Sequence, residues 1–195
     1  MRILRKLCVF CGSRPGAHPA YAEHARALGA QIAERGLELV YGGASVGLMG
    51  ELANAALEGG AKVTGVIPQW LVAKEIAHSG LTELKVVATM HERKALMAQL
   101  ADAFVALPGG FGTLDEAFEV ITWAQIGLHY KPLGFLNTMG YFGELEKFIS
   151  HLVAQGFAPD EHTGLFMFRG NPPQLLDAML AYSTPPPGDK SSDRR

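Results

Sequence analysis

Residues 108–116 read Pro108-Gly109-Gly110-Phe111-Gly112-Thr113-Leu114-Asp115-Glu116, and they directly follow the apolar run Ala103-Phe104-Val105-Ala106-Leu107. The apolar run is typical of a buried strand, and the residues from Thr113 to about Gly127 are typical of a helix. Glycines between a strand and a helix let backbone N–H groups approach a ligand closely, and the first N–H groups of a helix lack partners within it. The stretch therefore predicts a phosphate-binding loop at the start of a helix.

The same alternation of strand and helix runs through the rest of the chain. Strands are expected at residues 7–10, 37–41, 62–67, 84–87, 103–107, 133–136 and 165–168. Helices are expected at residues 21–34, 48–57, 90–100, 113–127, 143–154 and 172–181. This pattern indicates an α/β protein in which helices cover both faces of a parallel sheet. We predict a single Rossmann-like nucleotide-binding domain over residues 1–182, followed by a disordered Pro/Ser-rich tail over residues 183–195.

Two further glycine turns follow predicted strands, at residues 11–13 and 42–43. Because the carboxyl ends of parallel strands meet at one edge of a sheet, we expect all three turns to line one nucleotide crevice. Two familiar nucleotide-binding motifs are missing from the sequence. There is no G-x-G-x-x-G after the first strand and no G-K-[ST], which disfavours an NAD oxidoreductase and a P-loop NTPase.

Composition narrows the class of protein. The chain has 195 residues, 48% of them hydrophobic, and a formal net charge of −2, so bulk electrostatics favour neither nucleic acid nor an anionic membrane. No apolar run is long enough to span a bilayer. Cys8 and Cys11 form a C-x-x-C without a second pair of ligands, so we predict buried structural cysteines and no metal site. With two cysteines and no secretion signal, we expect a cytoplasmic protein.

Glu116 allows two interpretations. Thr113-x-x-Glu116 matches a capping box, in which Thr113 is the N-cap and Glu116 reaches back to its N–H. Alternatively, a carboxylate beside an anion site stabilises a developing cation or activates a water molecule. Arg93 and Lys94 either bind an oxyanion or belong to a solvated helix face, and His91 is interpreted as structural.

Two motifs at this spacing closely resemble those of a known family. Met90-His91-x-Arg93-Lys94 and Pro108-Gly109-Gly110-x-Gly112-Thr113-x-x-Glu116 resemble the LOG (lonely guy) family of cytokinin riboside 5′-monophosphate phosphoribohydrolases, and the resemblance extends over residues 6–180. Related members often carry the label lysine decarboxylase, but nothing in this chain resembles a pyridoxal phosphate site.

The resemblance implies hydrolysis of the N-glycosidic bond of an N6-substituted adenosine 5′-monophosphate, without a cofactor. It implies Arg93 and Glu116 as the catalytic pair. It also implies a set of substrate-binding residues: Glu75, Lys94, Gly109, Gly110, Phe111, Gly112, Thr113 and Thr122. Smaller members of the family are usually homodimers, and the apolar region Phe118–Trp123 agrees with this.

Three alternatives stay open at this point. The first is a nucleotide- or cofactor-binding carrier without hydrolysis, similar in fold to a molybdenum cofactor carrier. The second is a relative of DNA-processing proteins, and the third is a general AMP nucleosidase. A carrier would not need both Arg93 and Glu116, and DNA binding would require a basic face. The motifs bind ribose phosphate, which is common to AMP and to cytokinin nucleotides, so they do not separate the nucleosidase from the cytokinin-activating enzyme.

Overall fold

A computed structural model describes residues 4–72, 74 and 77–182 of the chain. Within these residues, parallel strands form one seven-stranded sheet in the order β4-β3-β2-β1-β5-β6-β7. The strands are β1 (Lys6–Phe10), β2 (Glu38–Tyr41), β3 (Val63–Pro68), β4 (Glu83–Val87), β5 (Ala103–Ala106), β6 (Leu133–Leu136) and β7 (Phe166–Arg169). The predicted α/β fold with one parallel sheet is confirmed.

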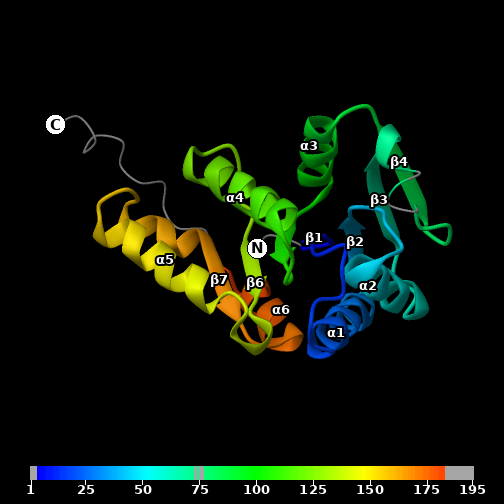
Figure 1. Cartoon of the computed structure of the whole chain (residues 1–195), viewed down its shortest axis with the longest axis horizontal. Helices are drawn as coiled ribbons and strands as arrows, with labels where there is room; N and C mark the ends of the chain where they lie inside the picture. Colours follow the sequence, from blue (N-terminus) through cyan, green and yellow to red (C-terminus); the bar gives the residue numbers. More distant parts are fainter. Residues whose placement is uncertain (1–3, 73, 75–76, 183–195) are drawn as a thin grey trace.

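The helices cover both faces of this sheet. They are α1 (Ala20–Glu34), α2 (Gly47–Glu58), α3 (Met90–Leu100), α4 (Phe111–Gln125), α5 (Gly143–Ala154) and α6 (Pro172–Leu180). Three short 3-10 helices were not predicted: η1 (Gln69–Leu71), η2 (Thr138–Gly140) and η3 (Asp160–Leu165). Helices α1, α2 and α6 pack on one face, and α3, α4 and α5 on the other (Figure 1).

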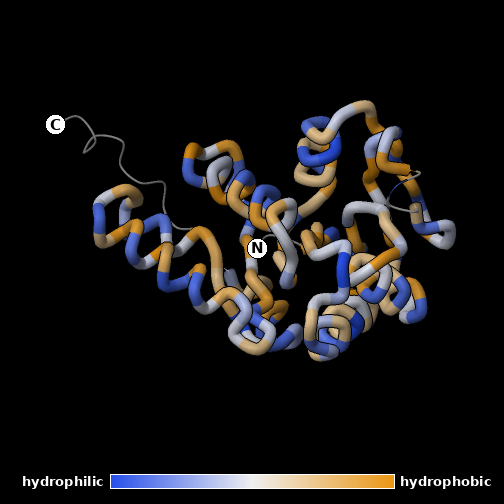
Figure 2. The backbone as a smooth tube through the Cα atoms, in the orientation of Figure 1, coloured by the Kyte–Doolittle hydropathy of each residue, from blue (hydrophilic) through white to orange (hydrophobic). Residues whose placement is uncertain are grey.

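Figure 2 shows where hydrophobic and hydrophilic residues lie along the backbone. Hydrophilic residues alternate with hydrophobic ones along α5, and none of the residues of this helix is fully buried. Helix α5 is thus the least covered of the long helices, with an apolar side that the described part of the chain leaves partly exposed.

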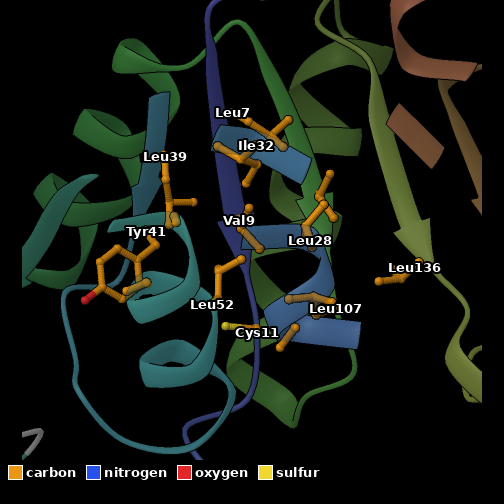
Figure 3. Close-up of a cluster of buried hydrophobic side chains, with 14 of the residues drawn as sticks. Leu7, Val9, Cys11, Leu28, Ile32, Leu39, Tyr41, Leu52, Leu107 and Leu136 are labelled. Atoms are coloured by element: carbon orange, nitrogen blue, oxygen red, sulfur yellow. The ribbon is translucent and has the colours of Figure 1, made fainter. Parts of the chain in front are cut away.

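Strand β1 lies at the centre of the core. Leu7 and Val9 face α1, where they pack with Leu28 and Ile32 (Figure 3). The intervening side chains of β1 point to the other face, toward α3 and α4. Because both faces are covered, the strand is apolar throughout rather than alternating.

The order of the strands reverses at β1. From β1 the sheet grows outward through β2 and β3 to β4, and β5 then returns to the other side of β1. Leu7 is therefore paired with Leu39 on one side and with Ala103 on the other. The loops that leave β1 and β5 turn to opposite faces of the sheet, and such a reversal opens a crevice at the carboxyl ends of the strands.

Two predictions fall outside the described residues: the substrate contact at Glu75 and the disordered tail at 183–195. In the part of the chain that is described, no helix combines the length and the apolar character needed to cross a bilayer.

Candidate active site

A cavity of about 660 Å³ lies where β1 and β5 end, at the reversal of strand order. Its walls come from segments that are far apart in the sequence. They are residues 11–16, Tyr21, Leu48, Met49, Met90, Arg93, residues 108–113, Glu116 and Tyr141. Three glycine turns were expected to line one crevice. The turns after β1 and β5 line this cavity, whereas Gly42 and Gly43 are not part of the wall that the described residues form.

The loops around the cavity are joined by backbone hydrogen bonds. The N–H of Gly12 donates to the carbonyl of Pro108 at 3.1 Å, and the N–H of Leu48 donates to the carbonyl of Gly12 at 3.1 Å. A Cβ on Gly109 would lie 2.1 Å from Oγ1 of Thr113 and 2.8 Å from the nitrogen of Gly12. Only glycine fits at position 109, because the neighbouring loop and the first turn of α4 leave no room for a side chain.

Helix α4 begins earlier than the sequence predicts. Its N-cap is Gly110, which has no side-chain cap, and Phe111 is its first residue. Thr113 is therefore inside the first turn, 4% exposed and packed close to Gly109, so the capping-box interpretation of Thr113 and Glu116 is wrong. The glycines at the start of the turn place their N–H groups at the N-terminus of the helix, where partners within the helix are missing.

The structure brings Arg93 and Glu116 to the same cavity from two different helices. Arg93 lies in the first turn of α3 and is 5% exposed, and its Nη2 donates to the carbonyl of Gly42 at 3.4 Å. Glu116 is half-buried and faces the cavity from α4. A guanidinium and a carboxylate thus share a cavity wall with the start of α4.

The pKa of the Cys11 thiol depends on the charges of both Arg93 and Glu116. Burial raises the pKa of the Cys11 thiol, the negative charge of Glu116 raises it further, and the positive charge of Arg93 lowers it. Both groups are therefore close enough to act on one thiol. Cys8 and Cys11 are free and buried, as predicted, and they belong to the cores on opposite faces of the sheet.

Lys94 lies beside the cavity, between α3 and α4. Its Nζ is 3.1 Å from Oδ2 of Asp115 and 3.0 Å from Oε1 of Glu119. Burial acts to lower the pKa of Lys94, but the hydrogen bonds and charges of Glu119 and Asp115 outweigh it, so the pKa is raised overall. Thr122 is exposed, and its hydroxyl donates to the carbonyl of Phe118 at 2.8 Å. The cavity wall formed by the described residues includes neither Lys94 nor Thr122.

Several cavity residues were not predicted as site residues, among them Arg14, Tyr21 and Tyr141. Arg14 adds a second cation to the cavity, beside the turn that follows β1. Tyr141 lies 32 positions beyond Gly109, and its hydroxyl donates to the Gly109 carbonyl at 2.6 Å. No pattern in the sequence around Tyr141 indicates this contact, because it depends on how β6 is placed next to β5.

Known proteins are similar to this chain in sequence and in fold. A family model described as "Possible lysine decarboxylase" matches residues 49–179. A probable cytokinin riboside 5′-monophosphate phosphoribohydrolase of Oryza sativa subsp. japonica is 49% identical over 178 residues, which are 91% of this chain and 78% of the relative. A cytokinin riboside 5′-monophosphate phosphoribohydrolase of Arabidopsis thaliana is 48% identical over 178 residues, 91% of this chain and 82% of the relative.

Among solved structures, the molybdenum cofactor carrier protein of Chlamydomonas reinhardtii matches with a TM-score of 0.70 and 24% identity, covering 92% of this chain and 100% of the carrier. At that identity the likeness shows a shared fold. The phosphoribohydrolases are about twice as similar in sequence over a similar share of this chain. The chain belongs to the LOG family, whose relatives are named cytokinin riboside 5′-monophosphate phosphoribohydrolases.

Proposed function

We propose that this protein hydrolyses the N-glycosidic bond of N6-substituted adenosine 5′-monophosphates, and of AMP, to give the free base and ribose 5-phosphate. One observation carries the proposal: Arg93 and Glu116 share a cavity with the glycine-rich N-terminus of α4. The names of relatives at 48% and 49% identity support the same reaction.

In this proposal the 5′-phosphate binds at the start of α4. Gly109, Gly110, Phe111, Gly112 and Thr113 supply N–H groups and the Thr113 hydroxyl around this point, and the positive end of the helix dipole favours an anion. Phe111 is 93% exposed, so its backbone rather than its ring is the part built into the loop.

Arg14 supports this placement of the phosphate by its charge. The N–H of Gly12 is hydrogen-bonded to the carbonyl of Pro108. This bond keeps the turn that carries Arg14 next to the phosphate loop. A guanidinium binds a phosphate through two parallel hydrogen bonds, so Arg14 supplies the cation that Lys94, engaged with Asp115 and Glu119, does not.

Glu116 and Arg93 perform the chemistry in this proposal. With the phosphate on the loop, C1′ of the ribose lies near Glu116, one turn further along α4. As the bond from C1′ to the base nitrogen breaks, its electron pair leaves with the base and positive charge develops on the ribose. Glu116 stabilises this charge and takes a proton from the attacking water, whose oxygen bonds to C1′, and the departing base nitrogen takes up a proton in its turn. Arg93 orients the ribose or its phosphate. In this proposal Glu116 activates the water, so no step depends on a metal ion or an organic cofactor.

We further propose a homodimer in the cytoplasm. Large apolar side chains are exposed just after α4, on α5 and just after α5 (Ile126, Leu128, Tyr130, Phe148 and Phe157). A second copy of the chain would cover these surfaces, which a monomer leaves in water. In such an assembly Thr122, exposed on α4, would lie near the partner, and Lys94 would hold α4 in place against α3.

The test is product analysis with three compounds: isopentenyl-AMP, AMP and adenosine. We expect free base and ribose 5-phosphate from the two monophosphates and little or no base from adenosine, because adenosine lacks the group that the α4 loop binds. The ratio of kcat/KM for the monophosphates separates cytokinin activation from AMP salvage. Binding of either nucleotide without release of base would overturn the proposal in favour of a carrier.

A further inference from the structure

Tyr141 contacts the phosphate loop from a distant part of the chain. It lies between β6 and α5, lines the cavity, and donates its hydroxyl hydrogen to the Gly109 carbonyl at 2.6 Å. The Tyr141 side chain belongs to neither helix that carries the proposed catalytic pair. Its contact with the loop therefore needs an explanation of its own.

Two aromatic rings hold the ring of Tyr141. Tyr21 on α1 lies edge-on to it, with ring centroids 5.7 Å apart and planes at 79°. Phe142, which is buried, lies edge-on at 4.9 Å and 86°. Edge-to-face pairs of this kind fix the orientation of a ring. The direction of the Tyr141 hydroxyl is thereby set before any ligand binds.

The backbone on either side of Tyr141 is braced as well. The N–H of Phe142 donates to Oδ1 of Asn137 at 2.7 Å. The hydroxyl of Thr138, which is fully buried, lies 2.9 Å from Nδ1 of His24 on α1. These bonds connect the segment between β6 and α5 to itself and to α1, and they hold the backbone at Tyr141 in place.

The peptide group that Tyr141 holds is the one that begins α4. The carbonyl of Gly109 and the N–H of Gly110 belong to one planar trans peptide and point in opposite directions. Fixing the carbonyl therefore fixes the direction of the Gly110 N–H, which belongs to the N-cap of the helix. Side-chain packing does not hold this part of the loop, since a Cβ on Gly110 or Gly112 would meet no atom within 4 Å.

We infer that Tyr141 is a positioning residue that sets the phosphate loop, residues 109–113, in its anion-binding conformation before the substrate arrives. The inference rests on the proposed function and adds a residue to it. Glycines give the loop conformational freedom, which would have to be lost on binding, and the hydrogen bond from Tyr141 removes that freedom in advance. Tyr141 acts on affinity for the phosphate and not on the bond that breaks.

The test is Tyr141→Phe, which removes one hydroxyl and keeps the aromatic ring. The loss of one hydrogen bond should raise the KM for AMP about tenfold and leave kcat within about twofold of the wild type. Inorganic phosphate, used as a competitive inhibitor, should bind correspondingly more weakly. An unchanged melting temperature would show that the variant is folded.

Tyr182→Phe is the matched control. The hydroxyl of Tyr182 also donates to a glycine carbonyl, that of Gly164 at 3.3 Å, but Tyr182 does not line the cavity. Tyr182→Phe should keep the KM of the wild type and its inhibition by phosphate. The inference is overturned if both variants have the same KM, or if Tyr141→Phe lowers kcat and leaves KM unchanged.

The two proposals can fail separately. If wild-type protein releases no base, the proposed function is wrong, and calorimetric binding of inorganic phosphate to the wild type and to Tyr141→Phe still tests the inference. Equal phosphate affinities would then refute it, and weaker binding by the variant would support it.

Discussion

The guanidinium of Arg93 occupies the space that a side chain on Gly42 would fill. A Cβ at Gly42 would lie 2.2 Å from Nη2 of Arg93, and the same nitrogen donates to the Gly42 carbonyl. The glycine that follows β2 therefore leaves room for the arginine of α3 to reach the cavity. The turn after β2 thus acts on the cavity through Arg93, although its glycines do not line the cavity themselves.

Gly42→Ala should inactivate the enzyme without unfolding it. The atom in the way is the end of a flexible side chain, so the backbone stays in place and the guanidinium moves away. A displacement of this size at a reacting centre costs on the order of a hundredfold in kcat/KM. Gly170→Ala is the control, because a Cβ there would meet no atom within 4 Å. Equal activity of the two variants would show that the position of Arg93 is unimportant.

Glu116→Gln should abolish turnover and preserve binding. The amide has the shape of the carboxylate but neither stabilises a cation nor accepts the proton of the water, so kcat should fall by about a thousandfold or more. Calorimetry should show AMP bound with an affinity close to that of the wild type. Glu144→Gln, in the exposed first turn of α5, controls for loss of a charge. Near-normal turnover by Glu116→Gln would leave Glu116 with a structural role only.

Lys94→Met should destabilise the fold, because it breaks the link from α3 to Asp115 and Glu119. The Lys94 side chain is 12% exposed and Asp115 is 64% exposed. We expect a loss of about 0.5–1 kcal/mol in the free energy of unfolding at pH 8. A higher KM with unchanged stability would instead place Lys94 in contact with the substrate.

The same link should depend on pH in a defined direction. The pKa of Lys94 is raised above its ordinary value of 10.5 in the folded protein, which means that the folded state holds the proton more tightly than the unfolded chain. The stabilisation is therefore complete below pH 10.5 and is lost as the pH rises through the pKa of the folded state. Urea unfolding of the wild type and Lys94→Met should show a constant difference up to that pH and a smaller one above it. A difference that grows with pH would contradict the ion-pair assignment.

Phe148→Glu should convert the proposed dimer to a monomer. Phe148 is 54% exposed on α5, and a charge there would be buried against the partner if α5 lies in the interface. Light scattering after gel filtration should show half the mass of the wild type. Leu180→Glu is the matched control, since Leu180 is 53% exposed at the end of α6, on the other face of the sheet. A monomeric wild type, or a dimeric Phe148→Glu variant, would refute the proposed interface.

The strands could be predicted from the sequence because a parallel sheet covered on both faces requires continuous apolar segments. Residues 133–136 were predicted without error for this reason. The start of α4 was predicted two residues too late. Thr113 and Glu116 have the spacing of a capping box, but glycine serves as the N-cap. Thr113 is buried beside Gly109, and Gly109 packs against Gly12 in the loop after β1. A tertiary contact overrides the local signal here.

The site could be predicted only in part, for a similar reason. Arg93 and Glu116 are carried by recognisable motifs, and each lies on a helix next to a predicted strand end. The contacts of Tyr141 with Gly109 and of Arg93 with Gly42 join residues 32 and 51 positions apart. Neither contact leaves a periodic or compositional signal, because each depends on the order of strands in the sheet.

The central position of β1 has a consequence for how the protein is made. Leu7 pairs with Leu39 and also with Ala103, and the nearby N–H of Lys6 donates to Asp102, 96 positions further along the chain. While the ribosome is still synthesising β2 to β4, one edge of β1 has no strand to pair with. Such distant pairing is slow, and an open apolar edge is prone to aggregation until it is covered. The turn after β1 receives its hydrogen bond to Pro108 only when β5 docks, so two walls of the cavity come together only once the middle of the sheet is complete.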